Sequence, residues 1–139
     1  MVTIRGTLPN NLELGGSATF KNGIFLASPT NIQYRAEGSL HLEGSKLFLD
    51  TIKVRNLDRD RRGGAALASG IVTFDGLSVS RVDFSVTSKG ILIMNKGSQV
   101  RNPKVFGDIV VASGSKPILF YGPLDAPVLA GDVDVLYAD

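Results

Sequence analysis

His41 is the only histidine in this chain of 139 residues, and the chain contains no cysteine. It lies between Ser39 and Glu43 in a stretch where polar and apolar residues alternate. Without a second histidine or a cysteine it cannot complete a usual zinc site, and a Ser-His-Asp constellation would have to stand on an exposed strand face. We therefore interpret His41 as a solvated surface residue and predict that the protein is not an enzyme.

Paired carboxylates occur as Asp58 with Asp60 and as Asp132 with Asp134. The second pair has i, i+2 spacing, which puts both side chains on one face of a strand, where they could hold a hard cation. Each pair supplies only two ligands, whereas calcium takes six to eight oxygen ligands. We interpret the pairs as parts of a turn and of a solvated face, and we predict no metal and no cofactor.

Two polar segments could contact phosphate. Ser113–Lys116 (SGSK) lacks the spacing of a phosphate-binding P-loop, and no helical pattern follows it, so it predicts a turn. Asp58–Gly64 (DRDRRGG) is rich in arginine, but its interleaved aspartates and its lack of stacking aromatic residues argue against such a contact. The formal net charge is only +2, so we predict no nucleic-acid partner.

The stretch Asn31–Gly44 (NIQYRAEGSLHLEG) contains the clearest structural pattern. Its even positions, from Ile32 to Gly44, are apolar or glycine, and its odd positions, from Gln33 to Glu43, are polar. Successive side chains of a strand point to opposite faces, so this period of two predicts one long strand with an apolar and a polar face.

Similar alternation continues along the chain, and no window shows sustained helical spacing. We predict a single all-β domain over residues 1–139, with roughly ten or eleven strands. Turn residues at Lys21–Gly23 and Gly44–Lys46 favour antiparallel hairpins. No apolar run is long enough to cross a bilayer as a helix.

The pattern predicts the facing of one further strand and leaves the facing of two segments open. Segment Lys46–Leu57 predicts a strand with Phe48, Ile52 and Val54 on one side. In residues 70–76 and 91–94 both parities are apolar, so the pattern leaves the facing of these segments open.

The remaining functional candidate is the apolar face itself. Two such sheets could close on each other as a sandwich core, or the face could line a groove that accepts an acyl chain, each buried CH₂ contributing roughly 0.8 kcal/mol. The residues predicted to form the apolar wall of that groove are Ile32, Tyr34, Leu40, Leu42, Phe74, Val82, Phe84, Val86, Ile109, Val111, Ile118 and Phe120.

Glycine-bounded segments recur at Gly38–Gly44, Gly70–Gly76 and Gly107–Gly114, which indicates a degenerate repeat. Together with the closing run YGPLDAPVLAGDV, Tyr121–Val133, this rhythm resembles the repeating β-region of TamB-like proteins of the AsmA superfamily, part of the translocation and assembly module. The resemblance extends from about Ile32 to the last residue. It depends on strand and glycine rhythm and includes no catalytic motif.

The resemblance implies a long antiparallel sheet curled into a β-taco with a hydrophobic groove. TamB-like proteins of Gram-negative bacteria are anchored in the inner membrane, cross the periplasm, and are implicated in phospholipid transport and outer-membrane biogenesis. We therefore expect this chain to be an internal, periplasmic fragment of such a protein. Its acyl-chain ligands would be phospholipids, and the outer-membrane assembly partner would bind parts of the protein absent here.

A second hypothesis belongs to a different class. The chain could form a closed β-sandwich or β-solenoid with a structural or adhesive role and no lipid ligand. In either case the end strands of an excised sheet would be unprotected edges, so we also expect a tendency to pair with a neighbouring copy.

Overall fold

The computed structural model describes residues 2–5, 13–27, 30–57, 64–100, 103–104 and 107–139, with side chains from residue 15 onward. The predicted Asp58 and Asp60 pair and most of the DRDRRGG segment lie outside these residues. The described elements are β1 (Val2–Arg5), β2 (Glu13–Ala27), β3 (Ile32–Gly44), β4 (Lys46–Asn56), β5 (Ala65–Asp75), β6 (Ser78–Met94), the 3₁₀ turn η1 (Lys96–Val100), β7 (Ile109–Ser113), β8 (Ile118–Pro123), β9 (Val128–Ala130) and β10 (Val133–Ala138).

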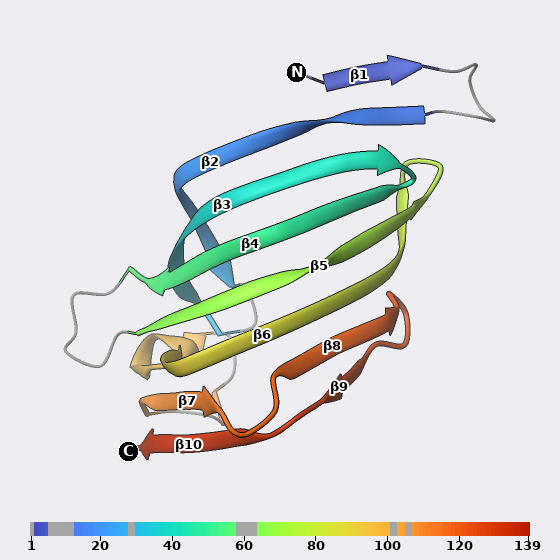
Figure 1. Cartoon of the computed structure of the whole chain (residues 1–139). Coiled ribbons are helices and arrows are strands. Elements are labelled where there is room, and N and C mark those ends of the chain that lie inside the picture. The colour runs from blue at the N-terminus through green and yellow to red at the C-terminus, as the bar shows by residue number, and fades with distance from the viewer. Residues whose placement is uncertain (1, 6–12, 28–29, 58–63, 101–102, 105–106) are drawn as a thin grey trace.

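The strands form one antiparallel sheet of ten strands (Figure 1). Strands β1 to β6 pair in sequence order, and β6 then pairs with β8 along its first half and with β7 along its last residues. Strand β9 then pairs with β8, and β10 pairs with β7. The two short strands β7 and β8 thus share the place next to β6, and β9 and β10 lie outside them. The sheet is therefore a meander from β1 to β6 that then branches into two arms, β8 with β9 and β7 with β10.

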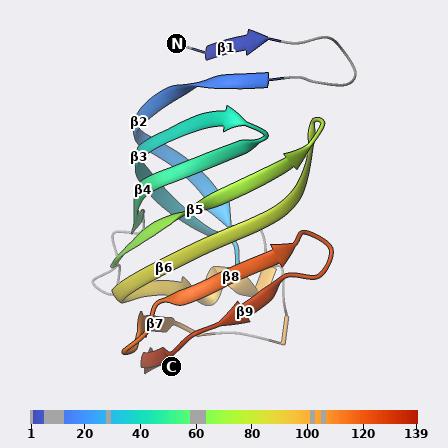
Figure 2. The same ribbon diagram turned by 45° about the vertical axis from the view of Figure 1, so that its right-hand side comes forward.

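The sheet is curled but open. In Figures 1 and 2, β2 and β3 bend back toward η1, whereas no pairing among the described strands joins β1 or β2 to β9 or β10. The prediction of a long, curled, mainly antiparallel sheet is confirmed. The closed, sandwich-like variant is wrong for the described strands, because they form one sheet that does not close on itself.

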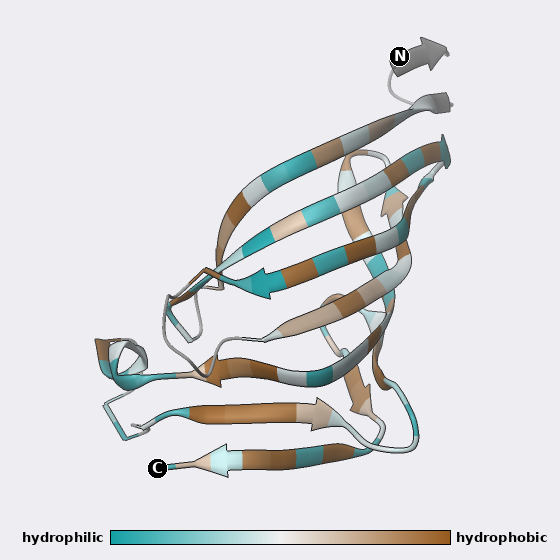
Figure 3. Ribbon diagram, turned by 60° about the vertical axis from the view of Figure 1, so that its left-hand side comes forward, coloured by the Kyte–Doolittle hydropathy of each residue, from teal (hydrophilic) through white to brown (hydrophobic). Residues whose placement is uncertain are grey.

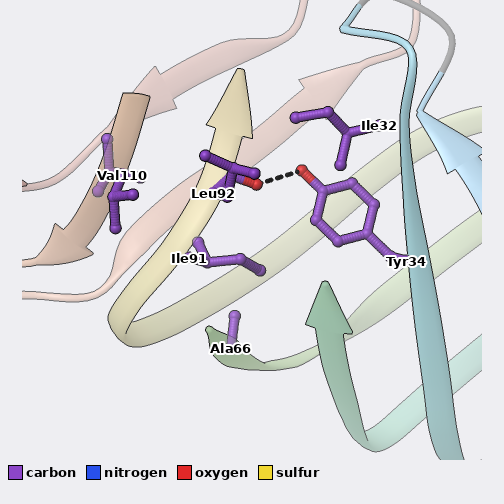
Figure 4. Packing of buried hydrophobic residues seen from close by; sticks show 7 residues of the cluster. Ile32, Tyr34, Ala66, Ile91, Leu92 and Val110 are labelled. Atoms are coloured by element: carbon purple, nitrogen blue, oxygen red, sulfur yellow. Dashed lines mark hydrogen bonds between the residues drawn. The ribbon is translucent and has the colours of Figure 1, made fainter. Parts of the chain in front are cut away.

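The hydrophobic core lies at one end of the sheet, where β3 begins and β6 ends, which we call the closed end. Figure 4 shows the Tyr34 hydroxyl donating a hydrogen bond to the Leu92 carbonyl over 3.0 Å, from β3 to β6. Both Ile91 and Leu92 are buried, so both faces of β6 are covered where the segment 91–94 begins, which explains why both parities are apolar there. The core cluster consists of Ile32, Tyr34, Ala66, Ile91, Leu92, Val110 and Val111.

Asn56 takes the place of a missing strand beside Leu92. Strand β5 begins at Ala65, which pairs with Gly90, so Leu92 lies beyond the end of that ladder. The Asn56 side chain accepts a hydrogen bond from the Leu92 amide at 3.0 Å and donates one to the Leu92 carbonyl at 2.8 Å. These bonds satisfy both backbone groups of a buried residue, as a neighbouring strand would.

The turn between β2 and β3 is tied to η1 and thereby completes the closed end. The Ser98 hydroxyl donates a hydrogen bond to the Thr30 carbonyl, and the Asn31 side-chain amide donates one to the Gly97 carbonyl at 3.3 Å. Ser98 is only 2% exposed, so its hydroxyl needs this partner. The closed end is thus sealed by side-chain contacts between segments that are far apart in the sequence.

Strand β6 pairs with β8 up to Val86 and with β7 from Ile91. Around Ser88, between these two ladders, side-chain hydrogen bonds take the place of backbone pairing on this side of the strand. The Ser88 amide donates to the Ser113 hydroxyl at 3.0 Å, and that hydroxyl donates to the Ser88 carbonyl at 3.2 Å. The Ser88 hydroxyl in turn donates to the Ala65 carbonyl at 2.8 Å. These bonds hold β5, β6 and β7 together where the sheet bends into the closed end.

A bulge at Asp50 corrects the predicted facing of β4. Ser39 pairs with Thr51 and Leu40 pairs with Leu49, so Asp50 is an extra residue opposite β3. An extra residue reverses which parity faces which side. Phe48 therefore pairs with His41 on the convex face, whereas Ile52 and Val54 lie on the concave face.

The two predicted hairpin turns have different outcomes. Gly44–Lys46 does turn β3 into β4, with Gly44 in the left-handed region at φ 59°. The prediction of a turn at Lys21–Gly23 is wrong, because β2 runs through this segment and its register against β3 shifts between Phe20 and Gly23. Asn22 adopts φ 57° there, which asparagine tolerates, so these turn-forming residues produce an irregularity within the strand.

Burial raises the pKa of the Tyr34 phenol to about 12. Because a free tyrosine ionises near pH 10, the unfolded chain releases this proton before the folded chain does. We expect the ionisation of Tyr34 to have no effect on the free energy of unfolding below about pH 9 and to lower it as pH rises from about 10 to 12. Urea unfolding across this range should show a weaker decline for Tyr34→Phe. An identical decline in both proteins would contradict the prediction.

Candidate apolar groove

The concave face of the sheet is formed by in-register apolar rows that cross several strands. One row runs through Leu42, Leu47, Val72 and Val82. The next continues from Leu40 and Leu49 over Gly70 to Phe84, Phe120 and Leu129. Figure 3 shows apolar and polar residues alternating along several of these strands, as expected for a sheet with two unlike faces.

Burial changes along this face. At the closed end Ile32 is 1% exposed and Leu92 is 2% exposed. Toward the turn between β3 and β4, which we call the open end, Leu40, Leu42 and Phe84 are only half-buried. The apolar surface of the core thus continues outward as a concave, partly uncovered surface, which we call the groove.

The curl divides the predicted wall residues into two groups. Ile32, Tyr34 and Val111 belong to the closed-end core, and Ile109 and Val86 pack against it. These five residues seal the closed end and leave little surface for a ligand. The predicted residues that lie on the concave face toward the open end are Leu40, Leu42, Phe74, Val82, Phe84, Ile118 and Phe120. Val82 is buried there, and the other six are partly exposed.

Sequence patterns missed two leucines of the groove. Leu47 and Leu49 pair with Leu42 and Leu40 on the concave face, although the parity of Ile52 and Val54 predicted the opposite side for them. The apolar triplet Leu47–Leu49 was the available signal, because an apolar run is compatible with either facing. The sequence pattern left the facing of residues 70–76 undetermined. The structure places Val72 on the concave face and Ile71 on the convex face.

His41 lies on the convex face, and its contacts do not form a catalytic triad. Its Nδ1 is 2.9 Å from Asp50 Oδ1, and its ring stacks on Phe48 with centroids 4.6 Å apart. The Ser39 hydroxyl donates to Asp50 Oδ2 at 3.1 Å. The carboxylate thus stands between serine and histidine, whereas nucleophilic catalysis needs the serine bonded to the base.

The polar candidates that lie within the described residues show no assembled site. Asp132 accepts a hydrogen bond from the Ser115 hydroxyl at 2.8 Å, within the SGSK turn between β7 and β8. Within the described residues, no group of three or more histidine, cysteine, aspartate or glutamate side chains could hold a metal ion. The same part of the chain contains no helix long and apolar enough to cross a membrane.

The fold and groove define a class of protein, an open antiparallel β-sheet with an apolar concave face. Comparisons of the chain with protein-family models, with curated proteins and with solved structures found no match. The resemblance to TamB-like proteins therefore stays a prediction from the residues quoted above.

Proposed function

We propose that this protein is a periplasmic, non-enzymatic segment of a TamB-like protein that shelters phospholipid acyl chains in its groove during transport between membranes and outer-membrane biogenesis. The observation that supports this function is the continuous apolar surface that leaves the core and stays partly exposed at Leu40, Leu42 and Phe84. Soluble proteins rarely leave a large contiguous apolar surface uncovered unless it binds something.

The length of the apolar row across the sheet suits an acyl chain. The row from Leu40 to Leu129 crosses five inter-strand spacings of about 4.8 Å, or roughly 24 Å. One leaflet of a bilayer has a hydrocarbon thickness of about 15 Å, which is half of the usual core. The row is therefore long enough for one extended chain, and its members are aliphatic and phenylalanine side chains with no charge.

Photocrosslinking tests this function directly. A photoreactive residue at Leu42 or Phe84 should capture acyl chains in cells, because both positions face the groove. His41 and Glu43 flank Leu42 on the convex face and provide matched controls that should capture none. Lipid adducts would be identified by mass spectrometry of the purified protein. Equal capture from both faces, or no capture at all, would overturn the proposal.

The remaining expectations about partners stay predictions. An outer-membrane assembly partner would bind outside this chain. Self-association through an edge would use β10, where Val133 is 49% exposed and Val135 is 62% exposed. An uncovered edge strand with such side chains is a template for pairing with another chain.

A further inference from the structure

The convex face near the closed end contains a like-charged pair in register. Arg35 of β3 lies directly opposite Arg55 of β4, and Lys53 follows on the same face. Like charges directly opposite each other destabilise a sheet. The neighbouring acid is Glu37, whose Oε1 lies 4.0 Å from the Arg55 guanidinium, at the limit of an ion pair. The repulsion is therefore only weakly compensated.

A hollow of about 210 Å³ lies among these charges. Arg35, Glu37, Lys53 and Arg55 line it together with Asn22, Asn56 and Leu57. Three cationic groups and one carboxylate give the hollow an excess of positive charge. Guanidinium groups present paired donors that match the oxygens of a phosphate.

Exposed aliphatic side chains border the cationic residues. Ile24 pairs with Arg35 and is 60% exposed, and Leu67 pairs with Lys53 and is 48% exposed. Leu26, on the same face of β2, is 44% exposed. We call these residues and the three cationic ones the convex patch, consisting of Ile24, Leu26, Arg35, Lys53, Arg55 and Leu67.

We propose that the convex patch binds the surface of a membrane that contains anionic phospholipids. The cationic side chains would contact lipid phosphates while the aliphatic ones enter the interfacial layer, a combination typical of proteins that lie on membranes. Sequence-independent binding of single-stranded nucleic acid uses stacking aromatic residues, and the patch has none. The groove opens on the opposite face of the sheet, so this contact is separate from the proposed acyl-chain site.

Vesicle co-sedimentation tests the proposal with the purified chain. The protein should sediment with vesicles of phosphatidylcholine and phosphatidylglycerol but not with vesicles of phosphatidylcholine alone. The double variant Arg35→Gln/Arg55→Gln should bind the anionic vesicles about thirtyfold more weakly, because each basic residue at a charged surface contributes about 1 kcal/mol. The control is the double variant Lys46→Gln/Lys116→Gln, which replaces two exposed lysines outside the patch. It removes the same charge and should bind the vesicles as the parent protein does.

Three results would overturn the proposal. They are absence of binding to anionic vesicles, equal weakening by both double variants, and binding of the parent to a single-stranded oligonucleotide but not to vesicles. Urea unfolding of both double variants would confirm that they fold. The test does not depend on the groove, because the convex patch lies on the opposite face of the sheet. Leu42→Gln, a substitution in the groove, should therefore leave vesicle binding unchanged, whatever the crosslinking experiment shows.

Discussion

Replacing Leu92 with alanine is expected to lower the free energy of unfolding by about 2–5 kcal/mol. Leu92 is 2% exposed and belongs to the closed-end core with Ile32 and Tyr34. The substitution removes buried methyl groups and leaves a cavity that the surrounding strands can fill only in part. The hydrogen bonds between the side chains of Asn56 and Tyr34 and the backbone of residue 92 are retained in this variant. The loss of stability therefore reports the packing of the Leu92 side chain.

Urea unfolding followed by circular dichroism would measure this change. The matched control is Leu77→Ala, in the turn between β5 and β6, where the side chain is 79% exposed. That substitution should alter stability by less than about 0.5 kcal/mol. Equal effects at Leu92 and Leu77 would show that the closed end is not the core of the fold.

Replacing Gly38 with alanine is expected to destabilise the protein by about 1–3 kcal/mol or more. A Cβ atom at this position would overlap the Thr51 carbonyl oxygen and come within 2.7 Å of Ile52 Cδ1. Glycine-to-alanine changes at open positions gain about 0.4–1 kcal/mol by restricting the unfolded chain. At Gly38 the overlap outweighs this gain, because the Thr51 oxygen is part of the β4 backbone and cannot rotate away.

Gly23→Ala is the matched control for Gly38→Ala. A Cβ at Gly23 would have its nearest neighbours, the Ala36 carbonyl oxygen and the Phe20 ring, at 3.5 Å, which is ordinary contact distance. We expect its stability to equal or slightly exceed that of the parent protein in the same urea experiment. A Gly38→Ala protein as stable as Gly23→Ala would mean that β3 and β4 are farther apart than the structure shows.

Local alternation was sufficient to predict most of the strands and the apolar face of β3. Ile32, Tyr34, Leu40 and Leu42 share a face because successive side chains of any strand point to opposite sides. The turn at Gly44–Lys46 was equally predictable, since glycine readily adopts the left-handed conformation found there. These features depend on a few consecutive residues and need no knowledge of the rest of the chain.

Only the tertiary structure decided which apolar residues are sealed in a core and which line an open groove. The bulge at Asp50 moves Leu47 and Leu49 into the groove. The apolar triplet Leu47–Leu49 is compatible with either facing, so only the pairing of β4 with β3 determines where the parity changes. The closed end depends on contacts between distant segments, such as Tyr34 with Leu92 and Asn56 with Leu92. Curvature arises from these long-range contacts and bulges, and it determines that Ile32 is buried while Leu42 stays partly exposed.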